Sequence, residues 1–98
     1  MKITKTQNAS TMELALEGRL DTMTAPELES ALNDVMNGAD SLVLDFSKLD
    51  YISSAGLRVL LSAHKAMSGK GGMKVINVNE IVQEVFDVTG FSDILTIE

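Results

Sequence analysis

Two adjacent serines, Ser53 and Ser54, stand where a polar loop gives way to a helical pattern that begins at Leu57. A serine at the start of a helix commonly accepts a hydrogen bond from an unpaired backbone N–H group of the first turn. One serine is enough for that capping position, so the other hydroxyl is left without a structural role. The chemistry open to it is that of an exposed hydroxyl at a helix start, where a negative charge is favoured.

Helix geometry indicates which serine is free. At about 100° per residue, the apolar side of the helix holds Leu57, Leu60, Leu61, His64 and Met67, and the polar side holds Arg58, Ser62 and Lys65. Extended back by one turn, the polar stripe passes through Ser54, whereas Ser53 falls on the apolar side. We therefore expect Ser54 to face solvent and Ser53 to lie lower, against a sheet.

A serine, a histidine and several carboxylates together suggest hydrolytic chemistry, but their spacing does not fit it. His64 is the only histidine, and it lies ten residues after Ser54, roughly 15 Å along a helix axis. A general base must lie within about 3 Å of the hydroxyl that it activates. The G-x-S-x-G motif and cysteine are both absent. We expect no enzyme activity, and we expect His64 to be a packing or interface residue.

Three aspartates, Asp21, Asp45 and Asp50, could hold a hard cation if their loops converged. They show no EF-hand or zinc spacing, and turn or capping roles account for each of them separately. No metal or cofactor is therefore expected.

The composition limits the classes of partner. The chain has 98 residues, enough for a single domain over 1–98, and a formal net charge of −6. An acidic chain without a Lys/Arg cluster indicates neither nucleic-acid binding nor direct membrane binding. Neither a signal peptide nor an apolar run of membrane-spanning length is present, so a cytoplasmic protein is expected.

The apolar patterning predicts alternating strands and helices. Strands are expected over 2–6, 12–17, 42–44, 73–78 and 94–97, and the first two should pair as an antiparallel hairpin. The run 42–44 is typical of a strand covered on both faces, and 47–50 reads as a polar bend. The Gly-Lys loop at 68–72 has no Walker spacing and reads as a turn.

Helix boundaries are also marked in the sequence. The first helix should start with a capping box of Thr24 and Glu27 and stop at Gly38. The third should start at Asn79 and stop at Gly90. Its buried stripe is predicted to consist of Ile81, Val82, Val85 and Phe86.

The order ββαβαβαβ predicts an α/β fold, in which a mixed sheet of about five strands carries helices packed on it. Sites in such sheets gather at the carboxyl ends of the strands. We expect the Asp21 loop and the Asp45–Ser54 loop to meet there.

Three segments resemble one known family: G-x-L-D-x-x-T-A-P-x-L at 18–28, LVLDFSKLDYISSAGLRVLL at 42–61, and TGF at 89–91. They are similar to the STAS domain and, more narrowly, to free-standing bacterial anti-sigma-factor antagonists. The resemblance implies a partner-switching regulator of transcription that acts as a monomer. Its unmodified form would bind an anti-sigma-factor serine kinase and release the sigma factor. Phosphorylation at the start of the second helix would end that binding, and a serine phosphatase would restore it.

The resemblance also assigns residues. Anchored on Gly56-Leu57, the family's phosphorylated serine falls on Ser54. Many members carry aspartate where this chain has Ser53, and a second hydroxyl residue where it has Ala55, so a shift of one position would make Ser53 the acceptor. The partner-binding residues implied are Asp21, Thr22, Asp45, Asp50, Ser53, Ala55, Gly56 and Arg58. A STAS subunit attached to a transporter, for instance in lipid trafficking, is the alternative.

Overall fold

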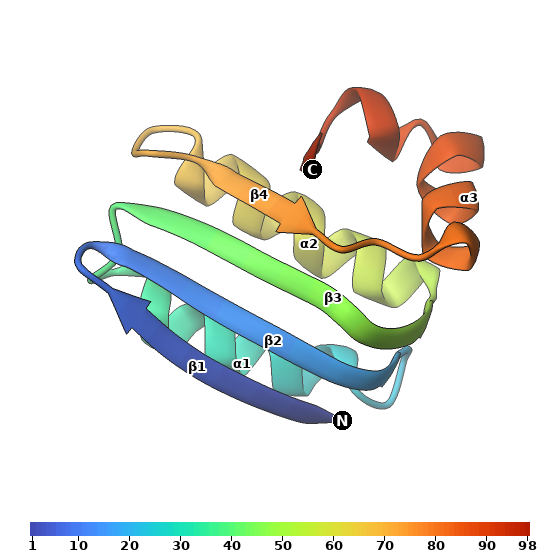
Figure 1. Cartoon of the computed structure of the whole chain (residues 1–98), viewed down its shortest axis with the longest axis horizontal. Helices are drawn as coiled ribbons and strands as arrows, with labels where there is room; N and C mark the ends of the chain where they lie inside the picture. The colour runs from blue at the N-terminus through green and yellow to red at the C-terminus, as the bar shows by residue number, and fades with distance from the viewer.

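A computed structural model describes all 98 residues, Met1–Glu98. The elements in chain order are β1 (Lys2–Asn8), β2 (Thr11–Leu20), α1 (Ala25–Met36), β3 (Ser41–Ile52), α2 (Ser54–Met67), β4 (Met73–Ile76), α3 (Glu80–Thr89), the 3₁₀ turn η1 (Phe91–Asp93) and β5 (Thr96–Ile97) (Figure 1). The predicted ββαβαβαβ order is thus confirmed.

The strands form one five-stranded sheet in the order β1-β2-β3-β4-β5. β1 pairs antiparallel with β2, and every later neighbour is parallel. The crossovers from β2 onward all advance in one direction across the sheet, so right-handed connections bring their helices to one face. Figure 1 shows α1 and α2 behind the sheet, with α3 beside its end. This mixed sheet with packed helices is the predicted fold.

The expectation that the run 42–44 is covered on both faces was wrong. Leu42 and Leu44 are buried against the helices, whereas Val43 is only half-buried. The opposite face of the sheet carries no helix, because consecutive strands advance in one direction and all three crossovers return to the same side. The Val43 side chain therefore faces the side of the sheet that no helix covers.

The central strand β3 is longer than predicted. The polar bend expected at 47–50 is instead part of the strand, which continues to Ile52. Its pairing with β2 shifts register twice, and at each shift β3 carries one more residue than β2. Such bulges bend and twist a strand without ending it. The carboxyl end of β3 consequently lies at Ile52, directly before the two serines.

The core lies between the helices and the sheet and contains no buried polar or charged residue. In α3 the predicted apolar stripe is only partly buried: Val82 and Phe86 are buried, Val85 is half-buried, and Ile81 is 60% exposed. The rings of Phe46 on β3 and Phe86 on α3 lie 6.3 Å apart, centroid to centroid. This contact defines the side of α3 that packs, and Ile81 lies outside it.

Of the four predicted helix ends, the two of α3 are confirmed. The Asn79 side chain accepts a hydrogen bond from the N–H of Val82, and Gly90 ends α3 in the left-handed conformation that glycine favours. α1 stops at Met36, two residues before Gly38. The capping box of Thr24 and Glu27 was wrong, because the Thr24 side chain makes no cap hydrogen bond to α1.

The loop at 68–72 is a turn, as predicted, and its lysine has a structural partner. The Lys70 Nζ donates hydrogen bonds to the carbonyl oxygens of Met36, at 2.6 Å, and Ala39, at 3.3 Å. A cation at the end of a helix is favourable because carbonyl groups there lack partners and carry the negative end of the dipole. The last strand is shorter than expected, since Ile94 and Leu95 precede β5.

Candidate functional site

Ser53 and Ser54 occupy the first turn of α2 in two different environments. Ser54 is the first residue of the helix and is exposed. Ser53 precedes it in an extended conformation, with φ −105° and ψ 176°, and is half-buried. Its hydroxyl oxygen is buried without a hydrogen-bond partner. The prediction that Ser54 faces solvent while Ser53 lies lower is confirmed.

The amino end of α2 has no side-chain cap. Ser53 occupies the cap position, but its side chain makes no cap hydrogen bond. The first N–H groups of a helix have no partner within the helix, and the dipole makes this end positive. A negatively charged group carried by Ser54 would meet both of these features. The arrangement therefore places an exposed hydroxyl beside unpaired N–H groups at the positive end of the helix dipole.

The loop after β2 lies directly beside the serines. Leu20 and Ile52 are paired in the sheet, and the N–H of Ser53 donates to the carbonyl of Leu20 at 2.8 Å. Asp21 follows Leu20, so its loop borders the start of α2. The meeting of the Asp21 loop with the serines is as predicted.

The Asp21 side chain organises this loop. Its Oδ1 atom accepts hydrogen bonds from the N–H groups of Met23, at 3.0 Å, and Thr24, at 3.2 Å. The Thr24 hydroxyl in turn donates to the carbonyl of Arg19 at 2.7 Å. Partial desolvation opposes the charged form of Asp21, but the hydrogen bonds from Thr24 and Met23 and the Arg19 guanidinium outweigh it and lower the pKa of Asp21. Asp21 is thus ionised at neutral pH and carries its negative charge in the loop that borders the start of α2.

Gly56 allows α2 to approach the sheet at this point. It is buried, and a Cβ atom added to it would lie 2.6 Å from Leu20 Cγ and 3.0 Å from Ile52 Cγ1. Real Cβ contacts are never this short, so only glycine fits here without a shift. Gly56 therefore affects the surface through the position of α2, and its small size serves contact within the domain.

A groove of about 270 Å³ separates α1 from α2 next to the serines. It is lined by Thr22, Ala25, Pro26, Glu29, Ala55, Arg58, Val59 and Ser62. Three predicted partner-binding residues, Thr22, Ala55 and Arg58, thus line a single groove. We use the term Ser54 surface for Asp21, Thr22, Met23, Ser54, Ala55 and Arg58.

Asp45 lies away from this surface. It was expected to end the central strand, but β3 runs seven residues past it, opposite the stretch of β2 from Ala15 to Leu20, so Asp45 lies roughly 17 Å along the sheet from Ile52. Its Oδ1 atom accepts hydrogen bonds from the N–H of Ser47, at 2.9 Å, and from the Asn77 amide, at 3.1 Å. Desolvation opposes ionisation, but these bonds and the nearby Lys48 lower the pKa of Asp45.

Asp50 is exposed on β3, two residues before the strand ends. Because Asp45 lies far along the strand, the three aspartates considered as cation ligands do not come together. No group of three histidine, cysteine or acidic side chains in the structure has the proximity that a metal ion requires.

The family model of the STAS domain matches residues 2–98, nearly the whole chain. The chain belongs to the STAS family.

Two relatives of this STAS domain are described as anti-sigma factor antagonists. It is 36% identical to a proposed anti-sigma factor antagonist, BtrV of Bordetella bronchiseptica, over 99% of this chain and 85% of that protein. It is 29% identical to the anti-sigma-B factor antagonist of Bacillus subtilis, over 93% of this chain and 84% of that protein.

Solved structures confirm the fold of this STAS domain. An anti-sigma factor antagonist from Mycobacterium paratuberculosis superimposes with a TM-score of 0.90 at 22% identity, covering 98% of this chain and 83% of that chain. The phosphorylated form of the Bacillus cell fate determinant SpoIIAA gives a TM-score of 0.76 at 15% identity, covering 99% and 91% of the two chains. At these identities the likeness concerns the fold alone.

Met23 of the Ser54 surface, and Arg19 and Tyr51 beside it, were not singled out from the sequence. The Met23 side chain is 83% exposed in the loop beside Asp21. The Arg19 guanidinium lies 4.6 Å from the centre of the Tyr51 ring, and its Nε lies 3.8 Å from Asp21 Oδ2. Met23 was detectable as an apolar residue in a polar loop. The Arg19–Tyr51 contact was not, because it depends on the register of β2 against β3.

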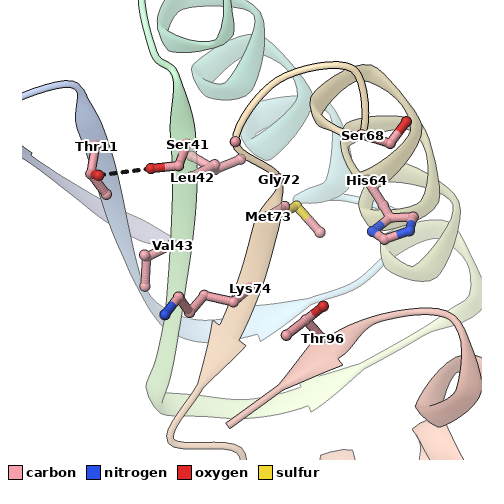
Figure 2. A pocket seen from close by; sticks show the side chains of 11 residues that line it. Thr11, Ser41, Leu42, Val43, His64, Ser68, Gly72, Met73, Lys74 and Thr96 are labelled. Carbon is pink, nitrogen blue, oxygen red and sulfur yellow. Dashed lines mark hydrogen bonds between the residues drawn. The ribbon is translucent and has the colours of Figure 1, made fainter.

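The largest cavity of the STAS domain, about 400 Å³, lies away from Ser54. Figure 2 shows His64 of α2 and Ser68, which follows the helix, facing Met73 of β4 and Thr96 of β5. His64 is half-buried, and its Nδ1 atom is buried without a partner. It lies ten residues after Ser54 in the same helix, roughly 15 Å along the axis, so it cannot act on that hydroxyl.

No helix of the domain has both the length and the apolar character needed to cross a membrane.

Proposed function

We propose that this STAS domain is an anti-sigma-factor antagonist controlled by phosphorylation of Ser54. The unmodified protein binds an anti-sigma-factor serine kinase in the cytoplasm and thereby frees a sigma factor. The kinase then phosphorylates Ser54, which ends the binding, and a serine phosphatase restores the unmodified form. The protein itself is a regulator without catalytic activity.

The observation that carries this proposal is the exposed hydroxyl of Ser54 at the uncapped start of α2. The relatives of this chain are described as anti-sigma factor antagonists, which supports a regulatory role for the Ser54 hydroxyl. Asp21 and the groove lined by Thr22 and Arg58 lie beside it and supply a surface for the kinase.

The energetics favour a switch that works through local charge. A phosphate adds about −1.5 to −2 charges at neutral pH. At the start of α2 that charge is stabilised by about 0.3–1 kcal/mol, so the domain stays folded. A partner that covers Ser54 would have to bury the same charge, and an unpaired buried charge costs several kcal/mol. Phosphorylation therefore weakens binding while the fold is unchanged.

The first test locates the phosphate. Wild type, Ser54→Ala and Ser53→Ala are incubated with ATP and the cognate anti-sigma kinase, and modified peptides are identified by mass spectrometry. Ser53→Ala is the matched control, because the Ser53 hydroxyl makes no hydrogen bond that the substitution could remove. We expect phosphate on Ser54 in wild type and in Ser53→Ala, and none in Ser54→Ala. Phosphate on Ser53, or on a hydroxyl outside these two residues, would contradict the assignment.

The second test separates charge from structure. Ser54→Ala should bind the kinase as tightly as unmodified wild type and should resist release by ATP. Ser54→Asp adds a negative charge at the favourable end of the dipole, so it should be at least as stable as Ser54→Ala but bind much more weakly. Thermal melts and binding isotherms distinguish the two properties. If Ser54→Asp loses helical structure together with binding, an order–disorder switch replaces the charge mechanism.

The partner itself is identified by co-purification from the native cell. Recovery of an anti-sigma kinase supports the proposal. Recovery of a membrane transport complex would favour a transporter-associated STAS subunit in its place.

A further inference from the structure

A strip of apolar side chains on α3 is exposed to solvent. Ile81 is 60% exposed and Val88 is 77% exposed, and half-buried Val85 lies between them. Positions spaced by four and seven residues share one side of a helix, so the three form a continuous strip about 10 Å long. We call this strip the α3 face. It is separate from the buried side of the helix, which carries Val82 and Phe86.

The segment that contains the α3 face is strongly acidic. Residues 75–98 include five aspartates and glutamates but no lysine, arginine or histidine. Glu80 and Glu84 are exposed on α3, and helix geometry places Glu84 directly beside Ile81 and Val88. Neither glutamate takes part in any of the ion pairs of the structure. The α3 face is thus an apolar strip bordered by unpaired negative charge.

The remaining carboxylate of α3 is turned away from this face. Asp87 accepts hydrogen bonds from the Ser92 hydroxyl and from the Gln83 amide, at 2.9 Å for the latter. These contacts direct it toward η1. The charge available to a partner therefore comes from Glu80 and Glu84.

We infer that the α3 face docks a basic amphipathic helix of another protein, whose apolar side covers Ile81, Val85 and Val88 and whose Lys/Arg residues pair with Glu80 and Glu84. Apolar residues at helical spacing are the contact pattern by which one helix packs along another. The bordering charges fix the sign of the partner, because like charges across an interface disfavour binding.

The negative charges of Glu80 and Glu84 disfavour the other possible partners of the α3 face. A second copy in a two-fold dimer would bring each strip against an identical strip with the same glutamates beside it. Anionic lipid surfaces and nucleic acids carry the same sign of charge as the face and would be repelled. The footprint is short, so we expect weak and reversible binding.

The α3 face shares no residue with the Ser54 surface. A partner bound there would not need to cover Ser54, so phosphorylation of Ser54 should not block its binding. This inference is therefore independent of the proposed function. A failure at the α3 face leaves the Ser54 switch untouched, and the reverse also holds.

The test uses a synthetic Leu/Lys peptide designed as an amphipathic helix, titrated into ¹⁵N-labelled protein and followed by NMR chemical shifts. A peptide of identical composition, scrambled to remove the apolar stripe, is the control ligand. We expect shifts confined to α3 and its neighbours with the amphipathic peptide only. Ile81→Gln/Val88→Gln should weaken binding about tenfold with an unchanged melting temperature, because both side chains are already exposed. Met23→Gln, which removes an equally exposed apolar side chain elsewhere, should bind like wild type. Glu80→Gln/Glu84→Gln should reduce the dependence of binding on salt.

Each contrary result overturns the inference in a recognisable way. Equal binding of the scrambled peptide would show attraction by net charge alone. Equal binding by Ile81→Gln/Val88→Gln would place the contact elsewhere. Self-association that this double variant abolishes, measured by sedimentation, would identify a second copy as the occupant.

Discussion

The contact between α2 and the sheet at Gly56 gives a prediction whose magnitude follows from the structure. In Gly56→Ala the new methyl would lie 2.6 Å from Leu20 Cγ and 2.9 Å from Leu20 Cδ2. Ordinary carbon contacts are about 3.5–4.0 Å, so Leu20 or the start of α2 must move by roughly 1 Å. Leu20 is completely buried.

Two opposing terms set the size of the effect. Overpacking of this kind costs about 1–3 kcal/mol. Alanine is favoured over glycine by up to about 1 kcal/mol inside a helix, and less in a first turn. We expect Gly56→Ala to lower the free energy of unfolding by about 1–2 kcal/mol, and the melting temperature by roughly 5–15 °C for a domain of this size. Gly69→Ala is the control and should change little, because an added Cβ there meets no atom within 4 Å.

A double-mutant cycle by thermal and denaturant unfolding tests the contact itself. Leu20→Ala alone should cost about 2–5 kcal/mol through the cavity that it leaves. Combined with Gly56→Ala, the new methyl occupies part of that cavity, so the two effects should fall short of additivity by about 1 kcal/mol or more. Strict additivity, or a Gly56→Ala melt that matches wild type, would refute the close approach of α2 to the sheet.

Three further substitutions test contacts at the helix ends and at the Asp21 loop. Asn79→Ala removes both the cap on Val82 and the amide hydrogen bond to the Leu49 carbonyl, and should cost about 2 kcal/mol in denaturant unfolding, whereas Asn79→Asp keeps the cap and should cost less. Lys70→Met removes the donor to the end of α1 and should cost about 0.5–1 kcal/mol, with melts at several salt concentrations as the measurement; no loss would mean that these exposed bonds contribute nothing. Asp21→Asn should be less stable than wild type at neutral pH. The folded pKa of Asp21 lies below its ordinary value of 3.8, so its contribution is present above that value and is lost as pH falls through the folded pKa. Melts of the two proteins should therefore converge in acid, and a difference that persists there would contradict an ionic role.

The fold was predictable where local signals agreed with the tertiary structure. The capping of α3 by Asn79 and its end at Gly90 depend on residues within one turn, and both are marked in the sequence. The order of strands and helices followed from periodicity. The length of β3 was not predictable in the same way, because Ser47 and Lys48 resemble a bend until their pairing with β2 is known.

Tertiary context also decided the capping of α1. Thr24 has the sequence of a capping box, yet its hydroxyl binds the carbonyl of Arg19, and the Asp21 carboxylate accepts the N–H groups of the turn. The exposure of Ile81 has a similar origin. Periodicity marks four apolar positions on α3, but the sheet offers a surface for only the side that meets Phe46.

The different exposure of the two serine hydroxyls follows from their positions around α2 relative to Gly56. Gly56 faces Leu20 and Ile52, so its direction marks the sheet side of α2. Ser53 lies three residues earlier, about 60° away around the helix, which turns its hydroxyl inward, as its burial shows. Ser54 lies two residues earlier, about 160° away, so its hydroxyl must point to solvent. A phosphate on Ser53 would place about −1.5 to −2 charges in a buried position, whereas on Ser54 the same charge meets water and the open helix end. We therefore expect a kinase to reach the exposed Ser54 more readily than Ser53, whose hydroxyl is buried.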